Sequence, residues 1–394
     1  MCKLGDLGSV AMNKRIFKEQ TSESGDIPFY KIGTFGATAD AFISRELFET
    51  YKKKYPYPKI GDLLISASGS IGRVVEYKGN DEYFQDSNIV WLKHDDRINN
   101  LFLKQFYSIV KWHGLEGSTI KRLYNKNILE TTIHLPVFDE QEKIGTLFKQ
   151  LDDTITLHQR KLDQLKNLKN AFLQLMFVSN SPENSTVPKL RFANFTEEWE
   201  LCVFFDTIEN TIDFRGRTPK KLGLDWSDNG YLALSALNVK HGYIDPNIDA
   251  HYGNQELYDK WMSGKELRKG QVLFTTEAPM GNVAQIPDNT GYILSQRTIA
   301  FETKKNRITD DFLAVLLGSP KIFNELSSLS SGGTAKGISQ KSLSQLRVQI
   351  PCSISEQKEI GIFFKQLNET ITLHQNKLDQ LKELKKSYLQ NMFI

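Results

Sequence analysis

The chain carries the same long segment twice. Residues 140–177 align without a gap with residues 356–393, at an offset of 216, and about 26 of the 38 paired positions are identical. The stretches that precede the two copies barely resemble one another. This order predicts one repeated scaffold that carries two different domains.

Each copy has apolar residues at alternating spacings of four and three, which is a heptad pattern interrupted by one lysine. The pattern predicts two long helices that pack on each other, each roughly 57 Å long at about 1.5 Å per residue. We expect an antiparallel pair, because a parallel pair would crowd both preceding domains at one end. The two stripes are Leu151, Ile155, His158, Leu162, Leu165, Lys169, Phe172 and Met176, and Leu367, Ile371, His374, Leu378, Leu381, Lys385, Tyr388 and Met392.

The two variable stretches read as mixtures of strands and helices that share one fold. Residues 59–66 resemble residues 268–275, and both continue through a glycine into a second short strand. We therefore predict an α+β protein with two mixed α/β domains, two long helices that form an antiparallel coiled coil, and an internal pseudo-two-fold repeat.

Composition narrows the class of protein further. The 394 residues are 40% apolar, the net charge is +3, and no apolar run reaches the ~18–20 residues that span a bilayer. The three cysteines, Cys2, Cys202 and Cys352, have no metal-ligand spacing. The first residues lack the apolar core of a secretion signal. We expect a cytoplasmic protein.

These residues resemble the specificity (S) subunit family of type I restriction–modification systems, over nearly the whole chain. The resemblance lies mainly in the duplicated Glu-Gln-x-x-Ile-Gly … Ile-Thr-Leu-His-Gln helices, with support from residues 61–72, 333–339 and 188–199. It implies target recognition domain 1 at 1–139, a central conserved helix at 140–177, a linker and lead-in at 178–200, target recognition domain 2 at 201–355, and a distal conserved helix at 356–394.

The resemblance implies a non-catalytic subunit that reads double-stranded DNA. Each recognition domain would read one half of an asymmetric, bipartite site, and the helix pair would set the gap between the halves. The helices would also dock two methyltransferase (M) subunits, which modify adenine at N6. Two restriction/translocase (R) subunits would complete the complex. S-adenosylmethionine, ATP and Mg²⁺ are expected in those partner subunits, and no cofactor is expected in this chain.

One departure from the family pattern concerns the first domain. Leu201-Cys202 aligns with Met1-Cys2, so the first domain begins without the Pro-Lys-Leu-Arg-Phe lead-in (188–192) that precedes the second. Either the protein starts late or this sequence begins inside a longer one. The packing of the first domain's N-terminal edge is the feature that this difference affects.

Short polar and forked side chains read base edges, whereas Lys, Arg and backbone amides hold phosphates. The alternative for each candidate is a turn-forming hydroxyl or a solvated charge. The candidates in the first domain are Ser66, Ser68, Ser70, Arg73, Gln85, Asn88, Lys121 and Arg122. Those in the second domain are Arg215, Arg217, Thr275, Thr276, Asn282, Gln296, Arg297, Thr334 and Lys336.

The predicted coiled coil leaves apolar residues on its flanks. We expect these residues to dock partner helices; the alternative is that they pack on the variable domains. They are Phe148, Leu157 and Leu168 in the first copy and Phe364, Leu373 and Leu384 in the second.

Three other interpretations are weaker. Pro287-Asp288 with Glu302-Thr303-Lys304 has the outline of a metal-dependent nuclease site, but nothing comparable occurs in the first domain. No Pro-Pro or glycine-rich cofactor loop supports a methyltransferase. The third interpretation is a coiled-coil adaptor that binds proteins rather than DNA, and the sequence does not rule it out.

The paired His158 and His374 have no third ligand at metal spacing, so we expect them to set helix register and predict no metal site.

Overall fold

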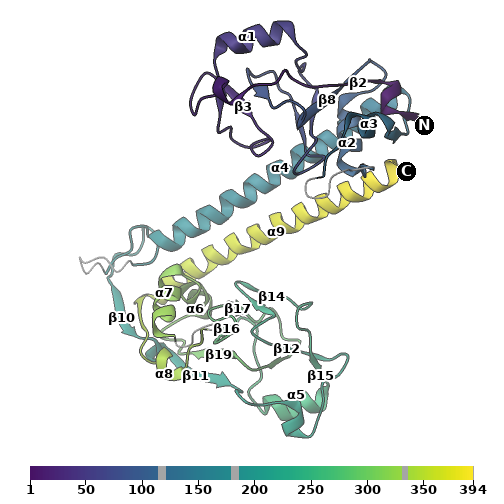
Figure 1. The fold of residues 1–394 in the computed structure, drawn as a ribbon. Helices are drawn as coiled ribbons and strands as arrows, with labels where there is room; N and C mark the ends of the chain where they lie inside the picture. Colours follow the sequence, from purple (N-terminus) through teal and green to yellow (C-terminus); the bar gives the residue numbers. More distant parts are fainter. Residues whose placement is uncertain (114–120, 179–185, 331–335, 394) are drawn as a thin grey trace. The chain divides into compact units, whose positions relative to one another are not determined.

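The computed structural model describes residues 1–113, 121–178, 186–330 and 336–393. It contains two compact units, which are unit 1 (Met1–Gln159 with Lys377–Ile394) and unit 2 (Arg160–Asn376). Each unit thus combines one variable domain with half of each long helix. The helices are α4 (Phe138–Leu175) and α9 (Ile354–Met392) (Figure 1).

Unit 1 is built on a four-stranded antiparallel sheet in the order β2-β8-β5-β6 and a three-stranded sheet in the order β4-β3-β7. A separate two-stranded pair joins β1 to β9. The strands are β1 (Cys2–Lys3), β2 (Gly8–Ala11), β3 (Ile27–Tyr30), β4 (Phe42–Ile43), β5 (Leu63–Ser66), β6 (Val74–Glu76), β7 (Tyr83–Phe84), β8 (Ile89–His94) and β9 (Thr132–Ile133). The helices are α1 (Arg45–Lys54), α2 (Asn100–Ile109), α3 (Asn125–Glu130) and the short 3-10 turns η1 (Leu4–Asp6) and η2 (Lys18–Gln20).

Unit 2 repeats this plan. Its sheets have the orders β11-β19-β16-β17 and β15-β12-β18, with the separate pairs β10-β20 and β13-β14. The strands are β10 (Trp199–Val203), β11 (Ile208–Asp213), β12 (Tyr231–Leu234), β13 (Val239–Lys240), β14 (Tyr243–Ile244), β15 (Tyr252–Gly253), β16 (Val272–Thr275), β17 (Val283–Gln285), β18 (Tyr292–Leu294), β19 (Thr298–Thr303) and β20 (Arg347–Pro351). The helices are α5 (Gln255–Met262), α6 (Asp310–Leu317), α7 (Pro320–Leu329), α8 (Gln340–Leu343) and the 3-10 turns η3 (Phe204–Thr207) and η4 (Pro219–Leu222).

The central strands of the two units have the same register and the same burial. Ile65 of β5 lies opposite Val90 of β8, and Phe274 of β16 lies opposite Ile299 of β19. All four residues of β5 and of β16 are buried, as a continuous apolar run predicts for a strand covered on both faces. The predicted common fold of the two domains is therefore confirmed.

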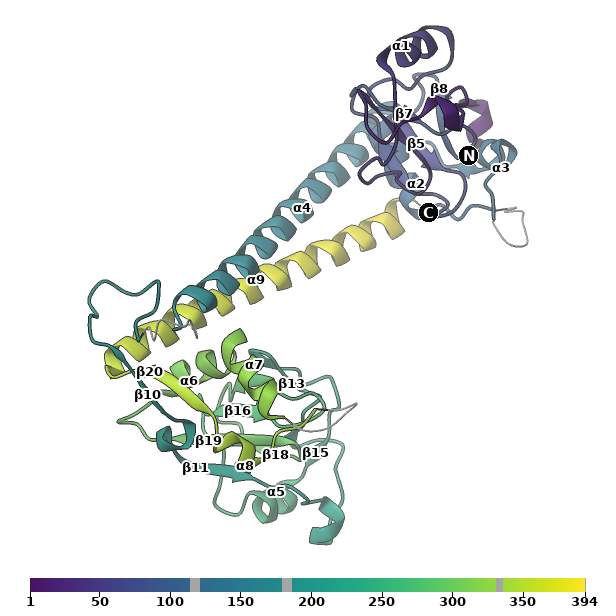
Figure 2. The same ribbon diagram turned by 60° about the vertical axis from the view of Figure 1, so that its left-hand side comes forward.

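The long helices pack antiparallel within each unit. In unit 1 Lys385 near the end of α9 forms an ion pair with Asp152 in the first half of α4 (2.5 Å), and the Phe393 ring lies 6.2 Å from that of Phe148. In unit 2 Phe172 near the end of α4 packs against Phe363 at the start of α9, with ring centroids 4.9 Å apart. Figure 2 shows from a second side that α4 and α9 run in opposite directions. The predicted antiparallel pairing is confirmed.

A glutamine fixes the start of each long helix to its domain. Gln141 accepts a hydrogen bond from the N–H of Asn99, the N-cap residue of α2 (2.9 Å), and donates to the Arg97 and Pro136 carbonyls (3.0 and 2.9 Å). Gln357 makes the equivalent bonds to Thr309, Arg307 and Pro351. Both glutamines are buried, so these bonds satisfy side chains that burial would otherwise penalise.

Candidate nucleic-acid interface

A tight turn joins two adjacent strands at the same place in each variable domain. It connects β5 to β6 in unit 1 and β16 to β17 in unit 2. The Ser66 hydroxyl accepts a hydrogen bond from the N–H of Arg73, and the Thr275 hydroxyl accepts one from the N–H of Asn282, both at 2.9 Å. The two turns therefore share their internal bonding although their sequences differ.

Three of the predicted DNA-binding residues are buried at these turns. Ser66 is 1% exposed and Thr275 is 0% exposed, and the hydroxyls of both are used to close the turn. Thr276, at 3% exposure, is also inside the fold. Their positions do not support the expectation that they read base edges; Ser66 and Thr275 are instead the turn-forming hydroxyls of the alternative interpretation.

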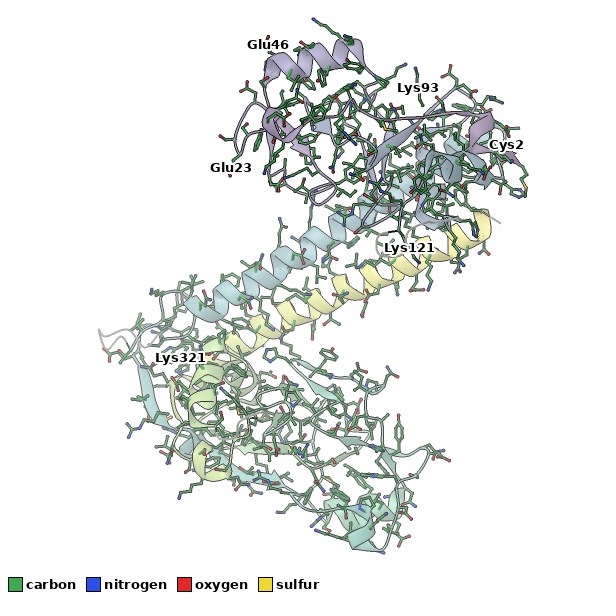
Figure 3. All side chains as sticks on the ribbon, viewed as in Figure 1. Cys2, Glu23, Glu46, Lys93, Lys121 and Lys321 are labelled. Atoms are coloured by element: carbon green, nitrogen blue, oxygen red, sulfur yellow. The ribbon has the colours of Figure 1, made fainter. Side chains whose placement is uncertain are left out.

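Polar side chains meet beside the turn of unit 1. Asn88 Oδ1 accepts hydrogen bonds from the Ser68 hydroxyl (2.7 Å) and from Arg122 Nη2 (3.0 Å). A β-bridge between Ser68 and Arg122 holds the segment before α3 against the turn. Exposed Lys121, which Figure 3 labels, precedes Arg122, and Ser70 is exposed at the turn. We call Ser68, Ser70, Asn88, Lys121 and Arg122 the unit 1 polar cluster.

Unit 2 has a different set of side chains at the equivalent place. Glu277 forms a β-bridge with Gly337, and its Oε2 lies 3.7 Å from Nε of exposed Arg297. Lys336 is exposed one residue before the bridge. We call Glu277, Arg297 and Lys336 the unit 2 polar cluster. The cluster exposes an acidic acceptor and two cations, where unit 1 has an amide, hydroxyls and two cations.

The backbone confirms that the two clusters are equivalent. The Asn88 carbonyl accepts a hydrogen bond from the N–H of Ala67 (2.7 Å), and the Arg297 carbonyl accepts one from the N–H of Thr276 (2.8 Å). Arg297 has a φ of 63°, in the left-handed region that L-residues rarely adopt. Such backbone strain is concentrated at functional sites.

Two predicted glutamines are tied into their domains. Gln85 Oε1 accepts a hydrogen bond from the N–H of Ile32 (2.9 Å), and Gln296 Nε2 donates to the Arg217 carbonyl (2.9 Å). Asn282 Nδ2 similarly donates to the Val239 carbonyl (2.9 Å). These amides position neighbouring segments, and none of them belongs to either polar cluster.

The remaining predicted arginines also have partners within the fold. Arg73 donates through Nη1 to the Phe35 carbonyl (2.7 Å). Arg217 donates to the Trp261 carbonyl and lies over the Phe214 ring, 4.4 Å from its centroid. Arg215 is exposed and its Nη2 lies 3.4 Å from a carboxylate oxygen of Asp213. Their role in binding stays a prediction. Thr334 lies outside the described residues.

Burial divides the six predicted docking residues into two groups. Phe148 and Phe364 are fully buried, against Phe393 and Phe177 respectively, so the expectation that they are open is wrong. They pack inside their own units, as the alternative interpretation holds. The other four are exposed: Leu157 (67%), Leu168 (45%), Leu373 (69%) and Leu384 (40%).

The aspartate of the nuclease-like pattern has a structural role. Asp288 accepts hydrogen bonds from the N–H and hydroxyl of Thr290 (3.0 and 2.7 Å) and from the Tyr292 hydroxyl (3.1 Å), so its carboxylate closes its own turn.

Among the described residues, no group of three or more His, Cys, Asp or Glu side chains is placed to hold a metal ion. None of the helices in the described ranges is long and apolar enough to cross a membrane.

Sequence reasoning missed the residues that anchor the long helices. Gln141 and Gln357 hold the helix starts, and Glu356 forms an ion pair with Arg191 at 2.7 Å. The signal was present, because the Glu-Gln pair at 140–141 and 356–357 is identical in the two copies. For the glutamines, this identity corresponds to the same three hydrogen bonds in both copies.

Comparisons with known proteins agree with this organisation. A family model described as the type I restriction modification DNA specificity domain matches residues 1–167 and 208–383. A putative type I restriction enzyme specificity subunit of Haemophilus influenzae, S.HindORF215P, is 55% identical over 158 residues, which are 39% of this chain and 41% of that protein. The putative MjaX specificity subunit of Methanocaldococcus jannaschii is 23% identical over 346 residues, which are 84% of this chain and 77% of that protein.

A solved structure shares the fold. The crystal structure of the S subunit of a type I restriction–modification system from M. genitalium superposes with a TM-score of 0.66 at 14% sequence identity. The superposition covers 100% of this chain and 95% of that chain. Since identity is so low, this likeness concerns the fold alone.

Proposed function

Because the chain belongs to the type I restriction modification DNA specificity family, whose members are non-catalytic DNA-recognition subunits, we propose that its two variable domains read the two halves of a bipartite DNA site. One observation carries this proposal. The two units present different polar clusters on the same turn, held by the same backbone bonds. A repeated scaffold with unlike exposed groups suits two half-sites of unlike sequence.

The chemistry of each cluster fits direct readout. Arg122 and Arg297 have the forked donors that match guanine O6 and N7, and Asn88 has the donor and acceptor that match adenine. Glu277 accepts hydrogen bonds, as recognition of a cytosine amino group requires. Lys121 and Lys336 are exposed beside the clusters and suit phosphate oxygens.

The family assignment implies a complex with DNA and with other restriction–modification subunits. The finer composition is part of the proposal: two M subunits, which use S-adenosylmethionine, and two R subunits, which use ATP and Mg²⁺, in the cytoplasm. Exposed Leu157, Leu168, Leu373 and Leu384 support docking on the helices. They occupy equivalent positions in the two copies, so each copy would take the same partner surface.

The test exchanges residues 1–139 for the recognition domain of another family member. The hybrid, co-expressed with its M subunit, should methylate adenine in a site in which one half is new and the other half is unchanged. Mapping methylated adenines across a genome reads both halves at once. A change in both halves, or in neither, contradicts the division of labour between the domains.

The adaptor interpretation predicts a different outcome in a simpler assay. The complex of the chain and its M subunit is tested for binding to two duplexes over a range of salt concentrations. One duplex contains the site identified by methylation mapping, and the other has a scrambled sequence. A DNA reader should prefer its site, and its affinity should fall steeply as salt rises. Equal, weak binding to both duplexes would favour the adaptor.

A further inference from the structure

Unit 2 contains a cavity of about 530 Å³ between its variable domain and the long helices. Residues of α4 and α9 line one side, and residues of β17, α6 and the turn between β13 and β14 line the other. The volume lies in the range of sites that hold small molecules. The apolar lining includes Leu173, Val315 and Phe364, and the titratable residues of the lining are Lys169, His241, Asp311, Lys365 and Glu369.

Two ion pairs occupy the corresponding positions of unit 1. Lys104 of α2 donates through Nζ to Glu76 of β6 (3.0 Å), and Lys385 of α9 pairs with Asp152 of α4 (2.5 Å). All four side chains are partly buried. Each cation of unit 1 therefore has a carboxylate from a neighbouring element as its partner.

Three of these four charges are absent from unit 2. The counterparts of the glutamate, of the α2 lysine and of the aspartate are Gln285, Ala314 and Asn368, and all three line the cavity. The equivalence follows from the matching registers of β5 with β6 and of β16 with β17, from the N-cap residues Asn99 and Thr309, and from the 216-residue offset of the helices. A methyl group thus stands where unit 1 has a long lysine side chain, which leaves space in unit 2.

Lys169, the counterpart of Lys385, keeps its charge in unit 2. It is half-buried at the cavity and has no ion pair or hydrogen bond among the described residues. Burial lowers the pKa of Lys169, and no carboxylate raises it, although Asp311 and Glu369 also line the cavity. Asp311 instead accepts a hydrogen bond from Gln285 Nε2 (2.8 Å). A cation that is partly removed from water without a counter-charge favours an incoming anion.

His241 brings a second nitrogen group to the same cavity. It lies in the turn after β13, and a Cβ added at Gly318, which caps α6, would lie 2.9 Å from His241 Cε1. The ring is accessible to solvent and has no hydrogen bond within the described ranges. Partial loss of water around the ring, and then the charge of Lys169, lower the pKa of His241. The imidazole and the ammonium group therefore lie close enough to act on one anion.

We propose that this cavity binds a small organic acid, whose carboxylate pairs with Lys169 and accepts a hydrogen bond from His241. The carboxylate of the acid takes the place that the Asp152 carboxylate has beside Lys385 in unit 1. Asn368 Nδ2 donates to the second carboxylate oxygen, and the apolar part of the acid lies against the apolar lining. The site is independent of the DNA sequence that the chain reads, so it goes beyond the proposed function.

The test titrates the full-length chain with benzoate and with benzamide, a neutral molecule of the same shape, and measures binding by saturation-transfer NMR. Benzoate should bind saturably and at least about ten-fold more tightly than benzamide, because only benzoate supplies a counter-charge. Benzoate should also shift the imidazole resonance of His241, which is identified by its absence from the spectrum of His241→Asn.

Two substitutions test the cation and its missing partner. Lys169→Met should weaken benzoate binding about ten-fold or more, because methionine removes the charge and keeps an unbranched side chain. Asn368→Asp restores the carboxylate of unit 1 and should weaken benzoate binding in the same way, since the aspartate competes for Lys169. The matched control is Lys166→Met, which changes an exposed lysine of α4 outside the lining and should leave binding unchanged.

Three outcomes overturn the proposal. One is the absence of saturable benzoate binding to the unsubstituted chain, and another is equal binding by the Lys169→Met and Lys166→Met chains. The third is that benzoate binds no more tightly than benzamide or inorganic phosphate, which would mean that the cavity selects apolar shape alone or charge alone. Thermal unfolding of each variant verifies that it is folded.

Discussion

Asn88 and Arg297 occupy the same backbone position in the two units, yet one presents an amide and the other a guanidinium. Their neighbours differ in the same way, since Arg122 lies opposite Ser68 where Gly337 lies opposite Glu277. Base recognition depends on the pattern of donors and acceptors at a groove edge. Under the proposed function, a change of side chains on turns that share their hydrogen bonds changes the sequence that a domain reads.

The first prediction concerns the cations of unit 1. The double variant Lys121→Ala with Arg122→Ala should weaken binding to the half-site read by the first domain by about 1–3 kcal/mol, and should lower the salt dependence of binding by one to two phosphate contacts. The control is Lys53→Ala with Lys54→Ala, which removes the same charge from α1. If both double variants bind alike at all salt concentrations, the unit 1 polar cluster does not contact DNA.

A second feature at this scale is Lys169, which has no ion pair among the described residues, whereas its counterpart Lys385 has one. Lys385 pairs with Asp152, but the residue equivalent to Asp152 in the second copy is Asn368, which lines a cavity of about 530 Å³ together with Lys169. Burial lowers the pKa of Lys169. Burial, and then the charge of Lys169, lower the pKa of His241 in the same cavity.

The shift at His241 predicts a pH dependence. Its pKa is near 6.5 in the unfolded chain and lower in the folded one, so below about pH 6.5 the unfolded state binds a proton that the folded state does not. The free energy of unfolding should fall as pH drops below 6.5, by at most about 1.4 kcal/mol per pH unit. Urea titrations at pH values from 7.5 to 5 measure the free energy of unfolding.

The control variant is His241→Asn, whose free energy of unfolding should lack the pH dependence that His241 contributes. The other charged groups that line the cavity are Lys169, Lys365, Asp311 and Glu369. An identical slope in the variant would mean that another group carries the effect.

At the scale of elements, each long helix approaches its domain closely at one glycine. A Cβ at Gly145 would lie 2.6 Å from Leu101 Cβ and 2.8 Å from the Phe102 nitrogen. A Cβ at Gly361 would lie 2.6 Å from Asp311 Cβ and 3.1 Å from backbone atoms of α6. Both neighbours include backbone, which cannot move aside as a flexible side chain does.

The third prediction follows from this contact. Gly145→Ala should destabilise unit 1 by about 1–3 kcal/mol, because the overlap with α2 outweighs the gain of about 1 kcal/mol that alanine brings to a helix. Thermal or urea unfolding measures the change. Gly33→Ala is the matched control, since no atom lies within 4 Å of the added Cβ. Equal stability of the two variants would show that the helix shifts freely on α2.

At the scale of the whole molecule, the repeat includes the helices, the sheets, the anchoring glutamines and the turns. Each compact unit takes half of α4 and half of α9, so neither variable domain is independent of the repeated helices. This organisation agrees with the expectation, implied by the family resemblance, that the helices set the gap between the two half-sites. The length of the gap would then depend on the length of the helices and not on either recognition domain.

The fourth prediction lengthens both helices together. Inserting one heptad after Gln159 and one after Gln375 adds about 10 Å of helix to each, which equals about three base pairs of DNA. Methylation mapping should then show a spacer longer by about three base pairs, or loss of activity. Unchanged spacing in an active enzyme would contradict the ruler role, and a heptad inserted in one helix only should disrupt the pair.

Much of the fold could be predicted from residue patterns. The 216-residue offset between two heptad stripes predicts the helices, because helical periodicity is a local property of the chain. The short apolar runs at 63–65 and 272–274 lie within β5 and β16. Antiparallel pairing followed from the order of domains and helices along the chain.

The site depended on contacts that no local pattern encodes. Ser66 and Ser68 stand two residues apart and both are buried, but the Ser66 hydroxyl closes its own turn whereas the Ser68 hydroxyl donates to Asn88. Asn88 finds Arg122 34 residues further along the chain. Likewise, identical Glu140 and Glu356 are exposed and buried respectively, because only the latter meets Arg191. The availability of a polar group depends on its distant neighbours, and folding alone brings those neighbours together.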